Sequence, residues 1–161
     1  MDGRAPSSPS TPLRSITARV QDLHSSVGDA RSTLTKEHDV ASHLSHSSVL
    51  VVDDEPGIRQ LISLHLRRLG CEVIEAPSVA QAIAVLETRR PDVIVSDYSM
   101  PMANGLDLLE YVRRRQLDIE FILSSDSLAD DVAAGARAAG AVVIRKDELF
   151  DILSPRLREA S

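Results

Sequence analysis

Residues 48–56 read SVLVVDDEP, and this stretch decides how the chain folds. Residues 48–52 form a short, largely β-branched run without polar alternation, which is typical of a strand that is buried on both faces. Acidic residues end the run, and Pro56 stands where the first turn of a helix would begin. The stretch therefore predicts a buried strand, an acidic loop and a helix.

The alternation of strand and helix continues along the chain. Four more strands are expected at residues 72–76, 93–96, 121–124 and 141–144. The five helices are expected at residues 56–69, 79–86, 106–112, 128–139 and 148–157. Ser78 with Gln81 has the pattern of a capping box, Ser127 with Asp130 marks the start of the fourth helix, and Pro155 breaks or kinks the last one. Strands that lack polar alternation need cover on both faces, which predicts an α/β fold with a parallel sheet.

The composition fits one globular domain with an appendage. The 161 residues are 43% apolar and 26% charged, and the net charge of −6 argues against non-specific nucleic-acid binding. Two tyrosines and two phenylalanines are too few for a base-stacking surface. No apolar run approaches the roughly 20 residues that a bilayer requires, and the single cysteine, Cys71, fits a reducing compartment. A soluble, acidic, cytoplasmic protein is expected.

Residues 1–47 differ in kind from the rest and are expected to form a separate tail before a domain at 48–161. Ser, Thr and His dominate this segment, and its charges cancel. Within residues 13–34, apolar side chains recur three and four positions apart, as in a coiled-coil seam. Two interpretations stay open: a short helix that pairs with itself or with a partner, and a disordered tail.

Polar residues stand at the carboxyl ends of the predicted strands. In an open parallel sheet this edge is where ligands bind. The residues in question are Asp53 and Asp54 after the first strand, Asp97 after the third, Ser124 after the fourth and Lys146 after the fifth. Lys146 is one of only two lysines against sixteen arginines, so a compact point charge stands at this position.

This set of residue types favours phosphoryl chemistry with a divalent metal. Three neighbouring carboxylates repel one another unless a cation neutralises them, and Mg²⁺ prefers oxygen ligands. An acid on a different strand from the other two is available as a nucleophile and would form an aspartyl phosphate. The hydroxyl of Ser124 and the ammonium of Lys146 could then stabilise the new phosphoryl group.

These residues resemble the receiver domain of two-component response regulators. The matching motifs are VLVVDDE at 49–55, VSDYSMP at 95–101, NG at 104–105, ILSS at 122–125 and Lys146. The resemblance covers essentially all of residues 48–161. It implies a flavodoxin-like, doubly wound fold with five parallel strands in the order 2-1-3-4-5.

The resemblance also implies a role for each site residue. Asp97 would be the phosphoacceptor, with Ser124 as the switch hydroxyl and Lys146 as the phosphate-binding lysine. Mg²⁺ would be held directly by Asp54 and through water by Asp53, and Asp97 also belongs to the metal site. The main-chain carbonyl of Ser99 would supply a further ligand.

The chain departs from the family pattern near the end of the domain. Asp147 replaces the usual proline after the lysine, and Val143 stands where an aromatic switch residue is expected. The residue after the switch hydroxyl is Ser125 rather than the common alanine. Outside the site, His65 is expected to pack in the domain, and the arginines at 113–115 are expected to form a solvated helix end.

Three functions compete. The first is a single-domain response regulator that takes a phosphoryl group from a sensor histidine kinase or a phosphotransfer protein and signals by contact with an output protein. It would bind neither nucleic acid nor membrane, and it would not be a conventional enzyme. The second is a receiver-like interaction module that works without phosphorylation. The third, an aspartyl-phosphate phosphatase, is disfavoured because Ser99 stands where such enzymes place a second acid.

Overall fold

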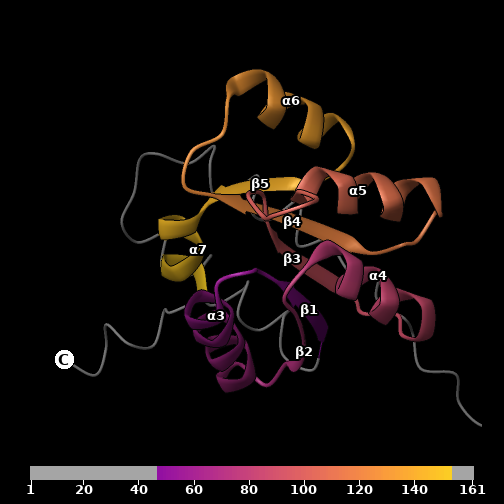
Figure 1. The fold of residues 1–161 in the computed structure, drawn as a ribbon. Helices are drawn as coiled ribbons and strands as arrows, with labels where there is room; N and C mark the ends of the chain where they lie inside the picture. Colours follow the sequence, from indigo (N-terminus) through magenta and orange to yellow (C-terminus); the bar gives the residue numbers. More distant parts are fainter. Residues whose placement is uncertain (1–46, 154–161) are drawn as a thin grey trace, which may run out of the picture.

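A computed structural model of the chain describes the backbone of residues 47–153 and the side chains of residues 47–149. Within this part, five parallel strands form one sheet in the order β2-β1-β3-β4-β5, as expected (Figure 1). The strands are β1 (Ser48–Val52), β2 (Glu72–Ala76), β3 (Val93–Asp97), β4 (Glu120–Ser125) and β5 (Val142–Arg145). The helices are α3 (Pro56–Arg68), α4 (Val79–Thr88), α5 (Gly105–Arg114), α6 (Asp130–Ala138) and α7 (Lys146–Leu153).

Helices cover both faces of the sheet, and a separate apolar core lies on each side. Figure 1 shows α3 and α7 on one face and α4, α5 and α6 on the other. Along β1, Val49 and Val51 pack into the core beneath α3 and α7, whereas Leu50 and Val52 pack into the opposite core. Burial on alternate sides explains why the strand sequences are continuous apolar runs.

Side-chain caps start two of the helices on the second face. The Ser78 hydroxyl accepts a hydrogen bond from the Gln81 amide at 3.2 Å, as its position in the sequence indicates. Asn104 and Asp107 form a full capping box at the start of α5, in which each side chain accepts from the other residue's main-chain amide. These bonds satisfy amides that a helix leaves without partners in its first turn.

The prediction for the start of α6 was wrong. The helix begins at Asp130 after Ala129, without a side-chain cap, rather than near Ser127. The Ser125 hydroxyl donates to the Ser127 carbonyl at 2.9 Å and accepts from the Ser127 amide at 3.3 Å. These bonds fix the main chain of Ser127 in a turn, and the first helical turn forms only from Asp130.

The last helix also starts at a different place from the predicted one. It begins at Lys146 and its described part ends at Leu153, whereas residues 148–157 were expected. The Arg145 amide donates to the Glu148 carboxylate at 3.3 Å, which lets the helix follow β5 directly. The expected break at Pro155 lies outside the described residues, as does the 13–34 stripe.

Arg113 is not part of a solvated helix end. Its guanidinium donates to the Ala139 carbonyl at 2.7 Å and to the carbonyls of Ile119 and Gly140 at 3.2 Å each. These bonds tie the end of α5 to the start of β4 and to the turn after α6. The prediction of a solvated helix end is therefore wrong for Arg113, which bonds carbonyls remote along the chain, whereas Arg114 and Arg115 are exposed as predicted.

His65 packs as the sequence indicates, and the structure shows in addition that Cys71 is buried. His65 is buried, with its Nδ1 2.8 Å from the Leu61 carbonyl oxygen, so it packs within the domain. Burial raises the pKa of the Cys71 thiol to about 11, which makes the thiol a poor nucleophile at neutral pH.

No helix in residues 47–153 is both long and apolar enough to cross a membrane.

Candidate functional site

Three carboxylates meet at the carboxyl edge of the sheet. Asp53 and Asp54 follow β1, and Asp97 is the last residue of the neighbouring strand β3. One carboxylate oxygen from each of the three acids lies within 4.8 Å of the others. Asp53 and Asp97 are only 1% and 5% exposed, and Asp54 is the most accessible of the three. The structure thus brings together the three acids that the sequence placed at strand ends.

Lys146 reaches the same place from the start of α7. Its Nζ lies 3.3 Å from Asp97 Oδ1 and 3.6 Å from Asp53 Oδ2. The lysine side chain is itself only 13% exposed, because it extends along the sheet edge toward the acids. One ammonium therefore faces two buried carboxylates, and Asp54 adds a third negative group beside them.

The electrostatics of the cluster favour an additional cation. Burial raises the pKa of both Asp53 and Asp97, although the Lys146 ammonium opposes this effect. For Lys146, burial alone would lower the pKa, but attraction to the two carboxylates outweighs it and raises the pKa. The acids retain unfavourable negative charge that one lysine does not neutralise.

The donor set fits a hard divalent ion. Asp53 Oδ1 accepts a hydrogen bond from the Glu55 amide at 2.9 Å. Among the described residues, Asp53 Oδ2 is buried and has no hydrogen-bond partner. A carboxylate oxygen that has only the Lys146 ammonium at 3.6 Å, beside two more carboxylates, suits Mg²⁺, which prefers oxygen ligands. Asp53, Asp54 and Asp97 would hold such an ion directly or through water.

Ser99 and Ser124 take positions around Asp97. The Ser99 main-chain amide donates to the Asp97 carboxylate, and its carbonyl as a metal ligand stays a prediction. Ser124 is paired in register with Asp97 across β3 and β4 and is fully buried. Its hydroxyl donates to the Ser96 carbonyl at 3.3 Å. The hydroxyl is therefore bound to the residue that precedes Asp97, and its side chain would have to rotate to reach a phosphoryl group on Asp97.

Gly105 supports the site by allowing a close approach that sequence reasoning missed. A Cβ atom at this position would lie 2.5 Å from the Asp97 carbonyl oxygen and 2.5 Å from Leu123 Cδ1. The Gly105 amide also donates to the Tyr98 carbonyl at 2.9 Å. The NG pair at 104–105 was the available signal, because it marks both a helix cap and a position without a side chain.

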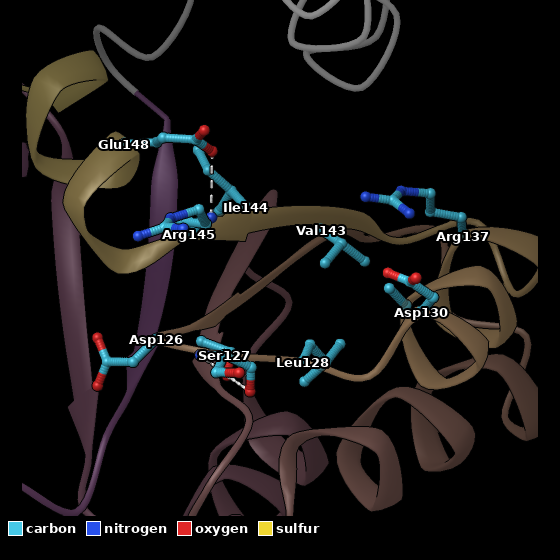
Figure 2. A pocket seen from close by; sticks show the side chains of 11 residues that line it. Asp126, Ser127, Leu128, Asp130, Arg137, Val143, Ile144, Arg145 and Glu148 are labelled. Atoms are coloured by element: carbon cyan, nitrogen blue, oxygen red, sulfur yellow. Dashed lines mark hydrogen bonds between the residues drawn. The ribbon is translucent and has the colours of Figure 1, made fainter.

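A pocket of about 320 Å³ lies beside the site, between α6 and β5. Figure 2 shows Val143 of β5 and Leu128 of the preceding loop facing each other across it, with Asp130 and Arg137 of α6 at one end. Ser125, which follows the buried Ser124, also lines the pocket. The loop that follows Ser124 at the end of β4 therefore lines this pocket.

Comparison with known proteins agrees with this geometry. Residues 49–153 match the response regulator receiver domain family. The chain is 34% identical over 112 residues to the probable transcriptional regulatory protein TcrX of Mycobacterium tuberculosis, a match that covers 69% of this chain and 48% of TcrX. It is 35% identical over 123 residues to the response regulator protein PilR of Pseudomonas aeruginosa, covering 72% of this chain and 25% of PilR. The matched part thus spans about half or less of each of these relatives.

Solved structures show the same fold. The signal receiver domain of the putative response regulator NarL from Mycobacterium tuberculosis aligns with a TM-score of 0.61 at 28% identity, over 72% of this chain and 97% of that one. The receiver domain of the Francisella response regulator 1452 aligns with a TM-score of 0.61 at 24% identity, over 72% of this chain and all of that one. The fold, the acid cluster and the match over residues 49–153 together place this chain in the receiver domain family of two-component response regulators.

Proposed function

We propose that this chain accepts a phosphoryl group on Asp97 in the presence of Mg²⁺. The observation that supports the proposal most is the meeting of the carboxylates of Asp53, Asp54 and Asp97 with the Lys146 ammonium. Buried acids with a single counter-charge fit a site that must bind a cation and then an anionic phosphoryl group.

Each residue has a defined part in the transfer. An Asp97 carboxylate oxygen attacks phosphorus and forms an O–P bond as the donor's P–N bond breaks, and the leaving nitrogen is protonated from solvent. Bound Mg²⁺ would neutralise charge on the phosphoryl oxygens. Lys146, already 3.3 Å from Asp97, would pair with a phosphoryl oxygen, and the Ser124 hydroxyl would leave the Ser96 carbonyl and donate to another.

The donor and the output follow from the same chemistry. A phosphohistidine of a sensor kinase or of a phosphotransfer protein is the proposed donor in the cytoplasm. Output would pass by protein–protein contact, because the described residues form only the receiver fold. Relatives such as TcrX are named as transcriptional regulators, but more than half of TcrX lies beyond the match. Direct nucleic-acid binding is therefore not part of the proposal.

The test is phosphorylation of the whole chain by phosphoramidate with Mg²⁺ or with EDTA, followed by intact mass measurement. We expect one added phosphoryl group with Mg²⁺ and none with EDTA. A folded chain that stays unlabelled in Mg²⁺ would contradict the proposal and favour the interaction module that works without phosphorylation. Two departures from the family pattern favour this second function: Val143 in place of an aromatic residue, and Asp147, which pairs with Arg145 at 3.0 Å, in place of a proline.

Phosphorylation should reorder residues 125–139 more than α3. In α6 only Ala133 and Ala136 are buried, whereas α3 buries Ile62 and Leu66 among other residues. The pocket beneath α6 and its uncapped start also lower the cost of moving it. Amide hydrogen exchange before and after phosphorylation should therefore change across 125–139 and stay constant in α3. Unchanged exchange at 125–139, or α6 protection equal to that of α3, would contradict this.

We also propose that residues 13–34 mediate self-association. The support is the heptad spacing of their apolar residues, since this segment lies outside the described structure. Light scattering should show that the full chain self-associates, with a mass of more than one chain, while residues 48–161 alone stay monomeric. Equal association states for the two proteins, with no extra helical circular dichroism from the tail, would favour the disordered interpretation.

A further inference from the structure

Arg59 of α3 holds the main chain at the acid cluster without being an expected metal ligand. Its Nη1 donates to the Asp53 carbonyl at 2.7 Å, and its side chain is only 14% exposed. The same guanidinium places its Nε 3.5 Å from Glu75 Oε2 on β2. Glu75 is in turn bound by Arg67 Nη2 at 2.9 Å. Arg59 therefore links the loop after β1 to the neighbouring strand.

The carbonyl that Arg59 binds belongs to the peptide bond between the two acids. Because a peptide unit is planar, fixing the Asp53 carbonyl also fixes the direction of the Asp54 amide and Cα. On its other side, the Asp53 amide donates to the Ala76 carbonyl at 3.2 Å. The Asp53 carboxylate accepts from the Glu55 amide at 2.9 Å. Among these contacts, the hydrogen bond from Arg59 is the one that orients the peptide bond between Asp53 and Asp54.

The charge of Arg59 and its geometry act in opposite directions on a bound cation. A guanidinium bound to the main-chain carbonyl of Asp53 would repel a divalent ion held by the Asp53 side chain, but the carboxylate of Glu75 offsets that charge. The planar fork lets one side chain bind the Asp53 carbonyl and the Glu75 carboxylate together. A lysine has a single ammonium at the end of a flexible stem and holds such a pair less well.

We propose that Arg59 is a positioning residue of the metal site, which aligns the carboxylates of Asp53 and Asp54 by holding the peptide between them. This inference rests on the proposed Mg²⁺-dependent function. Residues that orient metal ligands typically contribute 10–100-fold to metal affinity. Arg59 acts at the lower end of this range, because it holds the main chain rather than a carboxylate.

The test is calorimetric titration of the full chain with Mg²⁺, together with chemical unfolding of each variant. Arg59→Gln should raise the Kd for Mg²⁺ about tenfold. If Arg59 acted only through its positive charge, its removal would lower the Kd for Mg²⁺. A rise in the Kd therefore indicates a loss of geometry, and a fall indicates a loss of charge repulsion. Arg59→Lys keeps the charge and should also bind Mg²⁺ more weakly, and it serves as the second variant if Arg59→Gln unfolds.

Arg67→Gln is the matched control, because it removes an ion pair to the same Glu75 without touching Asp53. Its Kd for Mg²⁺ should stay within about twofold of wild type. Amide exchange at Asp54 and Glu55 should speed up in Arg59→Gln and not in Arg67→Gln. Wild-type protein that binds no Mg²⁺ would overturn both the proposed function and this inference. Wild-type binding with an unchanged Kd in both Arg59 variants, or equal losses in Arg59→Gln and Arg67→Gln, would overturn the positioning role alone.

Discussion

An Asp97→Asn chain should gain no phosphoryl group under conditions that label the wild-type protein. The carboxamide lacks the anionic oxygen that attacks phosphorus, while its shape fits the same buried position at the end of β3. The carboxylates of Asp53 and Asp54 lie within 4.8 Å of the Asp97 carboxylate and are unchanged in the variant. The variant therefore tests which acid of the cluster is the nucleophile. Intact mass after incubation with phosphoramidate and Mg²⁺ measures the result. Full labelling of Asp97→Asn would remove Asp97 from that role.

The same substitution should stabilise the fold at neutral pH in the absence of Mg²⁺. Burial raises the pKa of Asp97 above its ordinary value of 3.8, so the folded state binds this proton more tightly than the unfolded state. The contribution of Asp97 to the free energy of unfolding is therefore fully present below pH 3.8 and is lost as the pH rises through the raised pKa. Asparagine does not titrate and avoids this loss.

Denaturant unfolding with EDTA at pH 4 and pH 7 should reveal this difference. The advantage of Asp97→Asn over wild type should be larger at pH 7, and added Mg²⁺ should reduce it by binding the wild-type carboxylates. Glu87→Gln, on the exposed surface of α4, should show no such dependence. A less stable Asp97→Asn protein at pH 7 would mean that the Lys146 ion pair outweighs the burial of Asp97.

Gly105→Ala should destabilise the protein by about 3 kcal/mol, at the upper end of the usual cost of overpacking a core. The new Cβ would lie 2.5 Å from both the Asp97 carbonyl oxygen and Leu123 Cδ1. A leucine side chain can turn away, but the Asp97 carbonyl belongs to the main chain of β3 and cannot move without shifting the strand end. Denaturant unfolding measures the loss, and phosphorylation of the remaining folded protein should also slow because Asp97 is displaced.

Gly135→Ala in α6 is the matched control, since a Cβ there would meet no atom within 4 Å. Alanine is the better helix former, so this variant should gain about 0.5–1 kcal/mol of stability. The opposite signs at two helical glycines would show that packing at Asp97, and not the loss of glycine as such, sets the cost. Equal stability of Gly105→Ala and wild type would contradict the close approach.

Local patterns in the sequence were enough to predict most of the elements. The run at 48–52 predicted β1 with its observed bounds, because a strand buried on both faces needs apolar residues at every position. Ser78 was correctly identified as a cap because its hydroxyl bonds an amide only three residues away. The order of the strands, in contrast, came from the family motifs, since apolar runs alone do not reveal which strands pair.

The predictions that failed depended on competition between partners. Ser127 does not start α6, because its main-chain amide and carbonyl are bound by the Ser125 hydroxyl in a turn that precedes the helix. Arg113 belongs to a charged run in the sequence, but the carbonyls that accept its hydrogen bonds lie after α5 and after α6. A side chain with donors at the end of a long stem can reach several partners, and only the packed fold selects among them.

The sequence by itself determined that acids stand at the carboxyl ends of two strands and that a lysine follows the last strand. This was possible because the end of an apolar run marks the carboxyl end of a strand. Only the tertiary structure decided that Asp53 and Asp97 are buried and that Lys146 lies 3.3 Å from Asp97. The same holds for the Arg59 contact with the Asp53 carbonyl and for the absence of room at Gly105. These features arise from distances between segments that are remote along the chain, and such distances exist only once the strands have paired and the helices have packed against them.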